Sequence, residues 1–123
     1  CQAEIGSASG MAAAAICSVR GGSKEQMGYA CAMALKNLMG LVCDPVAGLV
    51  EVPCVKRNVG GAVNALAAAD MAVAGIASHI PVDQVIDAMG EVGMKMDVSL
   101  RETSMGGVAT SPKGLEIAER LGM

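Results

Sequence analysis

The sequence has almost no aromatic residues: Tyr29 is the only one, and Phe and Trp are absent from its 123 residues. Proteins that bind nucleic acid rely on stacking aromatic side chains and on clusters of Lys and Arg. This chain has nine basic residues against twelve acidic ones, which gives a net charge of −3. The composition therefore argues against a nucleic-acid-binding protein.

Long apolar runs are also missing, although the mean hydropathy is +0.49. The longest stretch without a charge, 5–19, has 15 residues and includes glycines and serines. A membrane-spanning helix needs about 20 mostly apolar residues. Glu4 occupies the place where a secretory signal peptide carries basic residues. We therefore expect a soluble, cytoplasmic protein.

The abundant residues are small or flexible: 21 Ala, 16 Gly and 10 Met, within a hydrophobic fraction of 53%. This much apolar surface excludes a disordered chain. A core without rings must be filled by aliphatic side chains at short distance, and small residues let helices approach closely. Length and composition together predict one all-α domain.

Helix signals recur along the chain and predict a compact bundle of about five to six helices. They place helices within 2–20, from the Ser23 cap to Gly40, from Pro53 towards Ser78, over 81–94 and from Pro112 to Gly122. The segments 43–52 and 97–110 are expected to be irregular. The helix that begins at Pro53 is apolar on nearly every side, so we expect this Ala/Gly-rich helix to be buried at the centre.

The five cysteines divide by their context. Cys17 and Cys31 lie in apolar helical patterns, where a free cysteine packs as a small hydrophobic residue. Cys1, Cys43 and Cys54 lie at helix edges or in loops, and the backbone N–H groups of helix starts favour a thiolate. Three thiolates from separate segments can bind a metal or an iron–sulfur cluster, or stay unliganded. Without CxxC spacing, zinc is the weaker hypothesis.

Four stretches carry a family resemblance: CQAEIGSASGM at 1–11, CDPVAGLVEVPCVKRN at 43–58, NALAAADM at 64–71 and DVSLRET at 97–103. They resemble the catalytic α domain of bacterial iron–sulfur L-serine dehydratases, and the match extends over essentially the whole chain. In that family three cysteines hold a [4Fe–4S] cluster whose fourth iron is open to substrate. The resemblance assigns these ligands to Cys1, Cys43 and Cys54.

The resemblance implies an L-serine ammonia-lyase, which converts L-serine to pyruvate and ammonia by β-elimination with the open iron as a Lewis acid. Lys56 and Arg57 are candidates to bind the substrate carboxylate, or else form surface or inter-subunit pairs. Asn58 is a candidate to orient the substrate or a cluster sulfide, with capping or core hydrogen bonding as its alternative. Glu4 and Glu51 are weak candidates for acid–base groups, with solvated carboxylates as the alternative.

Other residues in these stretches have a structural interpretation or none. Asp44, which precedes a proline, is interpreted as a turn former. The Gly60-Gly61 pair indicates close helix packing, and Gly106-Gly107 allows close approach of the backbone to a cluster or a neighbouring helix. Ser99 and Arg101 belong to a resembling stretch but receive no role.

Members of that family are much longer than this chain. The resemblance therefore implies that 1–123 is the C-terminal portion of the α domain. Its expected partners are the upstream part of that domain and a β domain or subunit, in a homo- or hetero-oligomer, with no nucleic acid and no membrane. The isolated chain is expected to be inactive because its pocket is incomplete. The alternatives are a cysteine desulfidase-type relative and a non-catalytic helical scaffold whose thiols never meet a metal.

Overall fold

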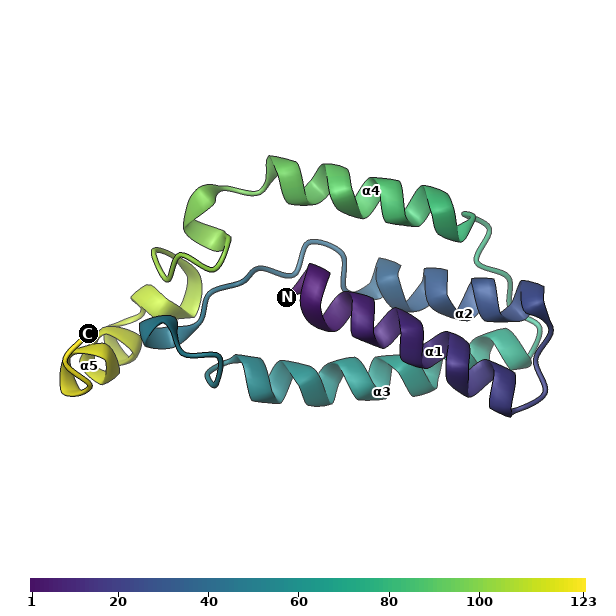
Figure 1. The fold of residues 1–123 in the computed structure, drawn as a ribbon, viewed down its shortest axis with the longest axis horizontal. Coiled ribbons are helices and arrows are strands. Elements are labelled where there is room, and N and C mark those ends of the chain that lie inside the picture. The colour runs from purple at the N-terminus through teal and green to yellow at the C-terminus, as the bar shows by residue number, and fades with distance from the viewer.

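The computed structural model describes all residues, 1–123, as a bundle of helices without a β-sheet (Figure 1). Its five α-helices are α1 (Ser7–Val19), α2 (Lys24–Asn37), α3 (Cys54–Val73), α4 (Val82–Lys95) and α5 (Pro112–Arg120). Four shorter segments complete it: the π-helix η1 (Gln2–Gly6) and the 3₁₀-helices η2 (Val46–Gly48), η3 (Val98–Leu100) and η4 (Gly107–Thr110). The predicted all-α fold class is confirmed.

Local signals place several helix ends where the sequence predicts them. Ser23 caps α2 with a complete capping box: its Oγ accepts from the N–H of Gln26 at 3.1 Å, and Gln26 Oε1 accepts from the N–H of Ser23 at 2.9 Å. Ser111 caps α5, and Pro112 occupies the first turn of that helix. Gly21, with φ of 83°, ends α1 in the left-handed conformation.

Alanine fills the main core, which lies between α1, α2 and α3. The buried residues of this core are Ala13, Cys17, Ala30, Met33, Ala34, Ala65, Ala68, Ala69 and Ala72. Because these side chains are small, the three helices pack at short distance, and the single aromatic residue, Tyr29, packs against this core while only partly buried. Cys17 is fully buried, which confirms its predicted place in the core, and Cys31 is half-buried on α2.

Polar side chains join the three helices inside this core. Asn64 of α3 donates from Nδ2 to Ser9 Oγ at 2.9 Å and to the carbonyl of Ala34 at 3.0 Å. Ser9 Oγ in turn donates to the carbonyl of Gly61 at 2.7 Å. These bonds satisfy buried polar groups and fix the register between α1 and α3, which run parallel. The N-terminal ends of both helices therefore lie side by side (Figure 1).

The expectation that the helix after Pro53 is buried at the centre of the bundle is wrong. One face of α3 packs on α1 and α2, while the opposite face exposes its larger aliphatic residues: Val55, Val59, Val63, Leu66 and Val73. The helix also ends at Val73 instead of near Ser78, because Gly75 adopts φ of 94° and closes a Schellman motif. The central helix is α2, which contacts α1, α3 and α4.

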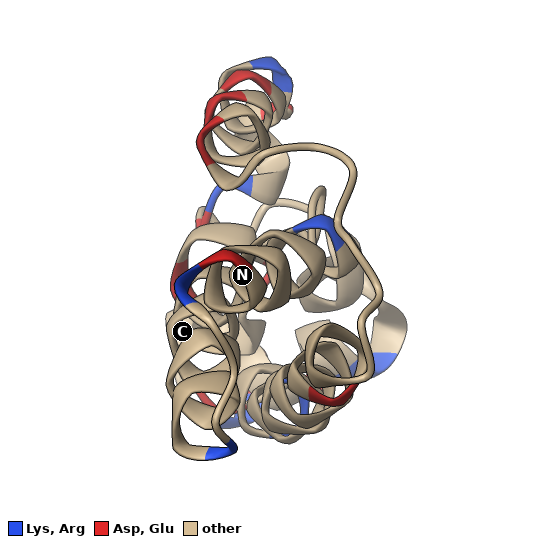
Figure 2. Cartoon of the chain, turned by 90° about the vertical axis from the view of Figure 1, so that its right-hand side faces the viewer, with Lys and Arg blue, Asp and Glu red and all other residues tan.

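The remaining elements extend this three-helix core. On the side of α2 away from α3, α4 packs through Val85 against Ala32 and Leu35. The segment 97–110 is irregular as predicted, and α5 rests on η2 and η4 at one end of the molecule (Figure 1). Viewed end-on, acidic and basic residues are scattered over the helices (Figure 2). None of the helices combines the length and the apolar character that a membrane crossing requires.

Candidate functional site

Three cysteine-bearing segments meet at one end of the bundle. Cys1 directly precedes η1, Cys43 lies in the connection between α2 and η2, and Cys54 is the first residue of α3. Cys54 is buried, Cys1 and Cys43 are half-buried, and all three are free thiols. The π-helical turn after Cys1 is a rare conformation that occurs frequently at functional sites.

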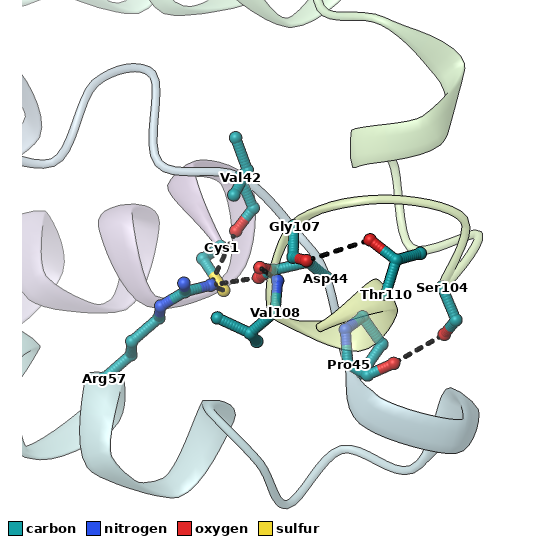
Figure 3. A network of polar contacts seen from close by, with 9 residues as sticks. All are labelled: Cys1, Val42, Asp44, Pro45, Arg57, Ser104, Gly107, Val108 and Thr110. Atoms are coloured by element: carbon teal, nitrogen blue, oxygen red, sulfur yellow. Dashed lines mark hydrogen bonds and ion pairs between the residues drawn. The ribbon is translucent and has the colours of Figure 1, made fainter. Parts of the chain in front are cut away.

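One side chain, that of Arg57, links these segments (Figure 3). Its Nη1 donates to the carbonyl of Val42 at 3.0 Å and to Asp44 Oδ1 at 2.5 Å, and it lies 3.7 Å from Cys1 Sγ. Val42 and Asp44 flank Cys43 on its two sides. Arg57 itself belongs to the first turn of α3, which begins with the third cysteine. A single guanidinium nitrogen therefore contacts or adjoins every candidate ligand segment.

The interpretation of Asp44 as a turn former is wrong. Its side chain is only 2% exposed, and its carboxylate accepts from Arg57 Nη1 and from the N–H of Val108 at 2.7 Å. Burial raises the pKa of Asp44, but the hydrogen bond from Val108 and the Arg57 charge outweigh burial, so the pKa lies below its ordinary value. The carboxylate joins the Cys43 segment to α3 and η4, and these partners are 13 and 64 residues away in sequence.

The backbone of Cys43 is held by the stretch 97–103. The N–H of Cys43 donates to the carbonyl of Leu100 at 2.9 Å, and the N–H of Glu102 donates to the carbonyl of Cys43 at 2.8 Å. Between them, the Arg101 guanidinium donates to two carbonyl groups at the C-terminal end of α4, both at 2.7 Å. Arg101, to which the sequence alone assigns no role, thus links the stretch that is bonded to Cys43 to the C-terminal end of α4.

Gln2, beside Cys1, is a further anchor that the sequence did not reveal. Its side chain is buried, accepts from the N–H of Gly40 at 2.8 Å and donates to the carbonyl of Met89 at 2.9 Å. Its own N–H donates to the carbonyl of Leu41 at 3.1 Å. These bonds fix η1, and with it Cys1, against α4 and the segment that follows α2. A glutamine next to a cysteine is too common a pattern to single out in advance.

Three free thiols on separate segments are the type of donor that iron–sulfur clusters take. No group of three or more His, Cys, Asp or Glu side chains is arranged to bind one metal ion. In a [4Fe–4S] cluster each thiolate bonds a different iron, so the sulfurs lie farther apart than around one ion. Burial raises the pKa of Cys54, and the negative charges of Cys43 and Glu4 raise it further, because these groups share one end of the bundle.

The other candidate residues stand outside the hydrogen-bonded network of Arg57. Glu4 in η1, Glu51 ahead of α3, and Lys56 and Asn58 in the first turns of α3 are all exposed. Asn58 lines a shallow pocket between α1 and α3. Of the predicted substrate-binding and acid–base residues, the structure places only Arg57 in contact with a candidate ligand.

Comparison with known proteins places the chain in a family. The family described as "Serine dehydratase alpha chain" matches residues 1–109. The "Probable L-serine dehydratase, alpha chain" of Bacillus subtilis is 63% identical over 98% of this chain, and the protein of that name from Latilactobacillus sakei is 60% identical over 95%. The "L-serine dehydratase, alpha chain" of Peptoniphilus asaccharolyticus is 53% identical over 95%. The chain spans 40%, 56% and 40% of their respective lengths. It belongs to the serine dehydratase alpha chain family.

Proposed function

We propose that 1–123 is the C-terminal portion of the α domain of a cytoplasmic L-serine dehydratase, which converts L-serine to pyruvate and ammonia. In this proposal Cys1, Cys43 and Cys54 hold a [4Fe–4S] cluster. The observation that carries it is the meeting of three cysteine-bearing segments around Arg57 in a chain of this family. The names of the curated relatives support the reaction. Five free thiols fit the reducing cytoplasm.

The chemistry is divided between the cluster and this chain's side chains. When bound, the cluster supplies an iron without a cysteine ligand, which acts as a Lewis acid toward the β-hydroxyl of the substrate. Arg57 orients the substrate carboxylate: its Nη1 is engaged, but its Nε and Nη2 donate no hydrogen bond within the chain. Lys56 and Asn58, on either side of it, add a positive charge and an amide for the same substrate.

Removal of the Cα proton is assigned to a carboxylate, with Glu4 and Glu51 as the candidates in this chain. Both are exposed, and each adjoins a cysteine-bearing segment. A general base must be held within hydrogen-bond reach of the proton that it removes, and an exposed carboxylate has no such fixed position. The rest of the α domain must therefore enclose the site before it can act, and the isolated chain is expected to form no pyruvate.

Cysteine substitutions test the proposed ligand set. Anaerobic reconstitution of the chain with iron and sulfide is expected to give about four irons per chain and the visible absorption of a cluster, because three thiolates bind it. Cys1→Ser, Cys43→Ser and Cys54→Ser are each expected to abolish this absorption. Cys31→Ser, at a half-buried thiol of α2, serves as the matched control and keeps it.

Two outcomes would contradict the proposal. One is a wild-type chain that binds no iron, and the other is iron binding that survives all three ligand substitutions. The reaction itself is tested on the full-length Bacillus subtilis relative with L-serine and L-cysteine as substrates. Release of sulfide from L-cysteine without pyruvate from L-serine would favour the desulfidase alternative.

The outer face of α3 is the surface on which the rest of the α domain packs. Five residues of this face are 39% to 63% exposed: Val55, Val59, Val63, Leu66 and Val73. Four of them, from Val55 to Leu66, follow one another over about three turns, and the exposed Asp70 separates them from Val73. Figure 1 shows α1 and α2 on the inner side of this helix only. An apolar stripe of this length is typical of a helix that receives another helix. The relatives are longer than this chain, and their additional residues supply the occupant.

Polar substitutions on this face test the docking surface. The double variant Val59→Ser/Val63→Ser is expected to weaken binding of the remaining part of the Bacillus subtilis alpha chain, expressed as a separate polypeptide, by at least about tenfold. Binding is measured by titration calorimetry. Val19→Ser, on an 88% exposed side chain of α1, is the control and leaves binding unchanged. Self-association of the chain that the double variant abolishes would instead identify a second copy as the occupant.

A further inference from the structure

We propose that Arg57 is a positioning residue that brings the three cysteine-bearing segments together before any cluster is bound. The inference rests on the proposed cluster site and gives Arg57 a task separate from substrate binding. It predicts that Arg57 matters for loading of the cluster and for local order in the unloaded protein.

The contacts of Arg57 support this role because they reach each segment independently. Nη1 meets the thiol of Cys1 at 3.7 Å, the carbonyl of Val42 at 3.0 Å and the carboxylate of Asp44 at 2.5 Å. The last two residues flank Cys43, and Arg57 shares a helical turn with Cys54. All three contacts come from Nη1 at the tip of the side chain, and lysine, whose side chain is one atom shorter, cannot place its nitrogen at the same point.

Burial makes this arrangement rigid. The side chain of Asp44 is 2% exposed and that of Arg57 is 23% exposed, so the ion pair is largely shielded from water. A buried carboxylate is costly unless it is paired and hydrogen-bonded, and Asp44 is held from its other side by the N–H of Val108. The Asp44–Arg57 pair therefore has little freedom to open, and the segment around Cys43 is fixed with it (Figure 3).

The loop that contains Asp44 is also held at a second point, so the groups that accept hydrogen bonds from Arg57 have less freedom to move. Ser104 Oγ donates to the carbonyl of Pro45 at 2.6 Å and accepts from the N–H of Gly48 at 3.1 Å. Asp44 is thus clamped between Arg57 on one side and the 104–108 segment on the other. The Cys43 segment is positioned by side chains from both α3 and the C-terminal part of the chain, and only Arg57 also contacts Cys1.

Two simpler roles make different predictions. If Arg57 served only to neutralise Asp44, removing both charges together would restore the wild-type properties. If Arg57 only bound substrate, its loss would leave cluster loading and local order unchanged. The positioning role alone predicts that a charge-balanced double variant still loses both.

The test compares Arg57→Gln, the double variant Asp44→Asn/Arg57→Gln and Arg57→Lys with the wild-type chain. The matched control is Arg20→Gln, which breaks the Arg20–Asp70 ion pair, an exposed Arg–Asp pair near the other end of α3. Circular dichroism confirms that each variant folds, and the double variant avoids the unpaired buried carboxylate that Arg57→Gln leaves. The readouts are iron and sulfide bound after anaerobic reconstitution, and amide hydrogen exchange at Gln2 and Cys43 in the unloaded protein.

We expect iron affinity to fall by about 10- to 100-fold in both Arg57→Gln and the double variant, as for residues that orient metal ligands. Exchange at Gln2 and Cys43 is expected to speed up by about tenfold in both, because the segments are released locally. Arg57→Lys is expected to lose affinity to a similar extent although it keeps the charge. Arg20→Gln keeps wild-type values.

Failure of the inference is distinguishable from failure of the proposed function. A wild-type chain that loads iron, together with a double variant that loads equally and exchanges at the wild-type rate, overturns the positioning role and leaves the cluster proposal standing. A wild-type chain that binds no iron contradicts the cluster proposal. In that case amide exchange alone decides the inference, and unchanged rates at Gln2 and Cys43 overturn it.

Discussion

Gly107→Ala is expected to lower the free energy of unfolding by about 3 kcal/mol, the sum of two separate costs. Gly107 has φ of 63°, where an L-residue is about 1–2 kcal/mol less favourable. The added Cβ would also lie 2.6 Å from Asp44 Cβ and 2.7 Å from Asp44 Cγ, far inside van der Waals contact. The Asp44 side chain cannot turn away, because Arg57 and Val108 bind its two oxygens.

Urea denaturation of the two variants Gly107→Ala and Gly21→Ala separates these costs. Gly21 also has a positive φ, 83°, but an added Cβ there would meet no atom within 4 Å. Gly21→Ala therefore carries the backbone cost alone, about 1 kcal/mol. Equal losses of stability in the two variants would mean that the Asp44 carboxylate moves aside at little cost. The hydrogen-bonded network around Arg57 would then be more mobile than its burial indicates.

The sequence predicts those parts of the fold that local interactions decide. The capping box at Ser23 and the proline at Pro112 each specify a helix start through neighbours within four residues. The position of Asp44 depends instead on partners 13 and 64 residues away, and an Asp-Pro pair in sequence is equally suited to a turn. The family resemblance identifies the three cysteines as ligand candidates, and Arg57 is a substrate-binding candidate from sequence, but the sequence does not reveal that Arg57 lies among the three cysteine-bearing segments.

Hydrophobicity alone also misplaces the buried face of α3. On a hydrophobicity ranking Val59 and Val63 should be buried before Ala65 and Ala68, yet the valines are exposed and the alanines are not. Small residues let α3 approach α1 and α2 closely, so the alanine face is the one that packs within this chain. The valine face is apolar because, in our proposal, it packs against further residues of the α domain. In this proposal the apolar pattern of α3 contains two interfaces, an alanine face and a valine face. The periodicity of the sequence does not tell which of the two packs within the chain.

Ala68→Leu is expected to destabilise the chain by about 3 kcal/mol, at the upper end of the usual cost of overpacking a core. Ala68 is 0% exposed and lies in the cluster that α1, α2 and α3 share. Three additional carbon atoms have no void to enter, so α3 must move away from its neighbours. That movement would stretch the hydrogen bonds of Asn64 to Ser9 and Ala34, one turn earlier on the same helix.

Ala67→Leu is the matched control, because Ala67 is the preceding residue of the same helix and is exposed. Its effect on the free energy of unfolding is expected to stay within about 0.5 kcal/mol, since helix propensities of Ala and Leu are close. Thermal and urea denaturation measure the stability of both variants. A large difference between them would show that this sequence, with its single aromatic residue, requires close packing across alanine. Equal midpoints would mean that the three helices have room for a larger side chain, and the scarcity of aromatic residues would then need a cause outside the core.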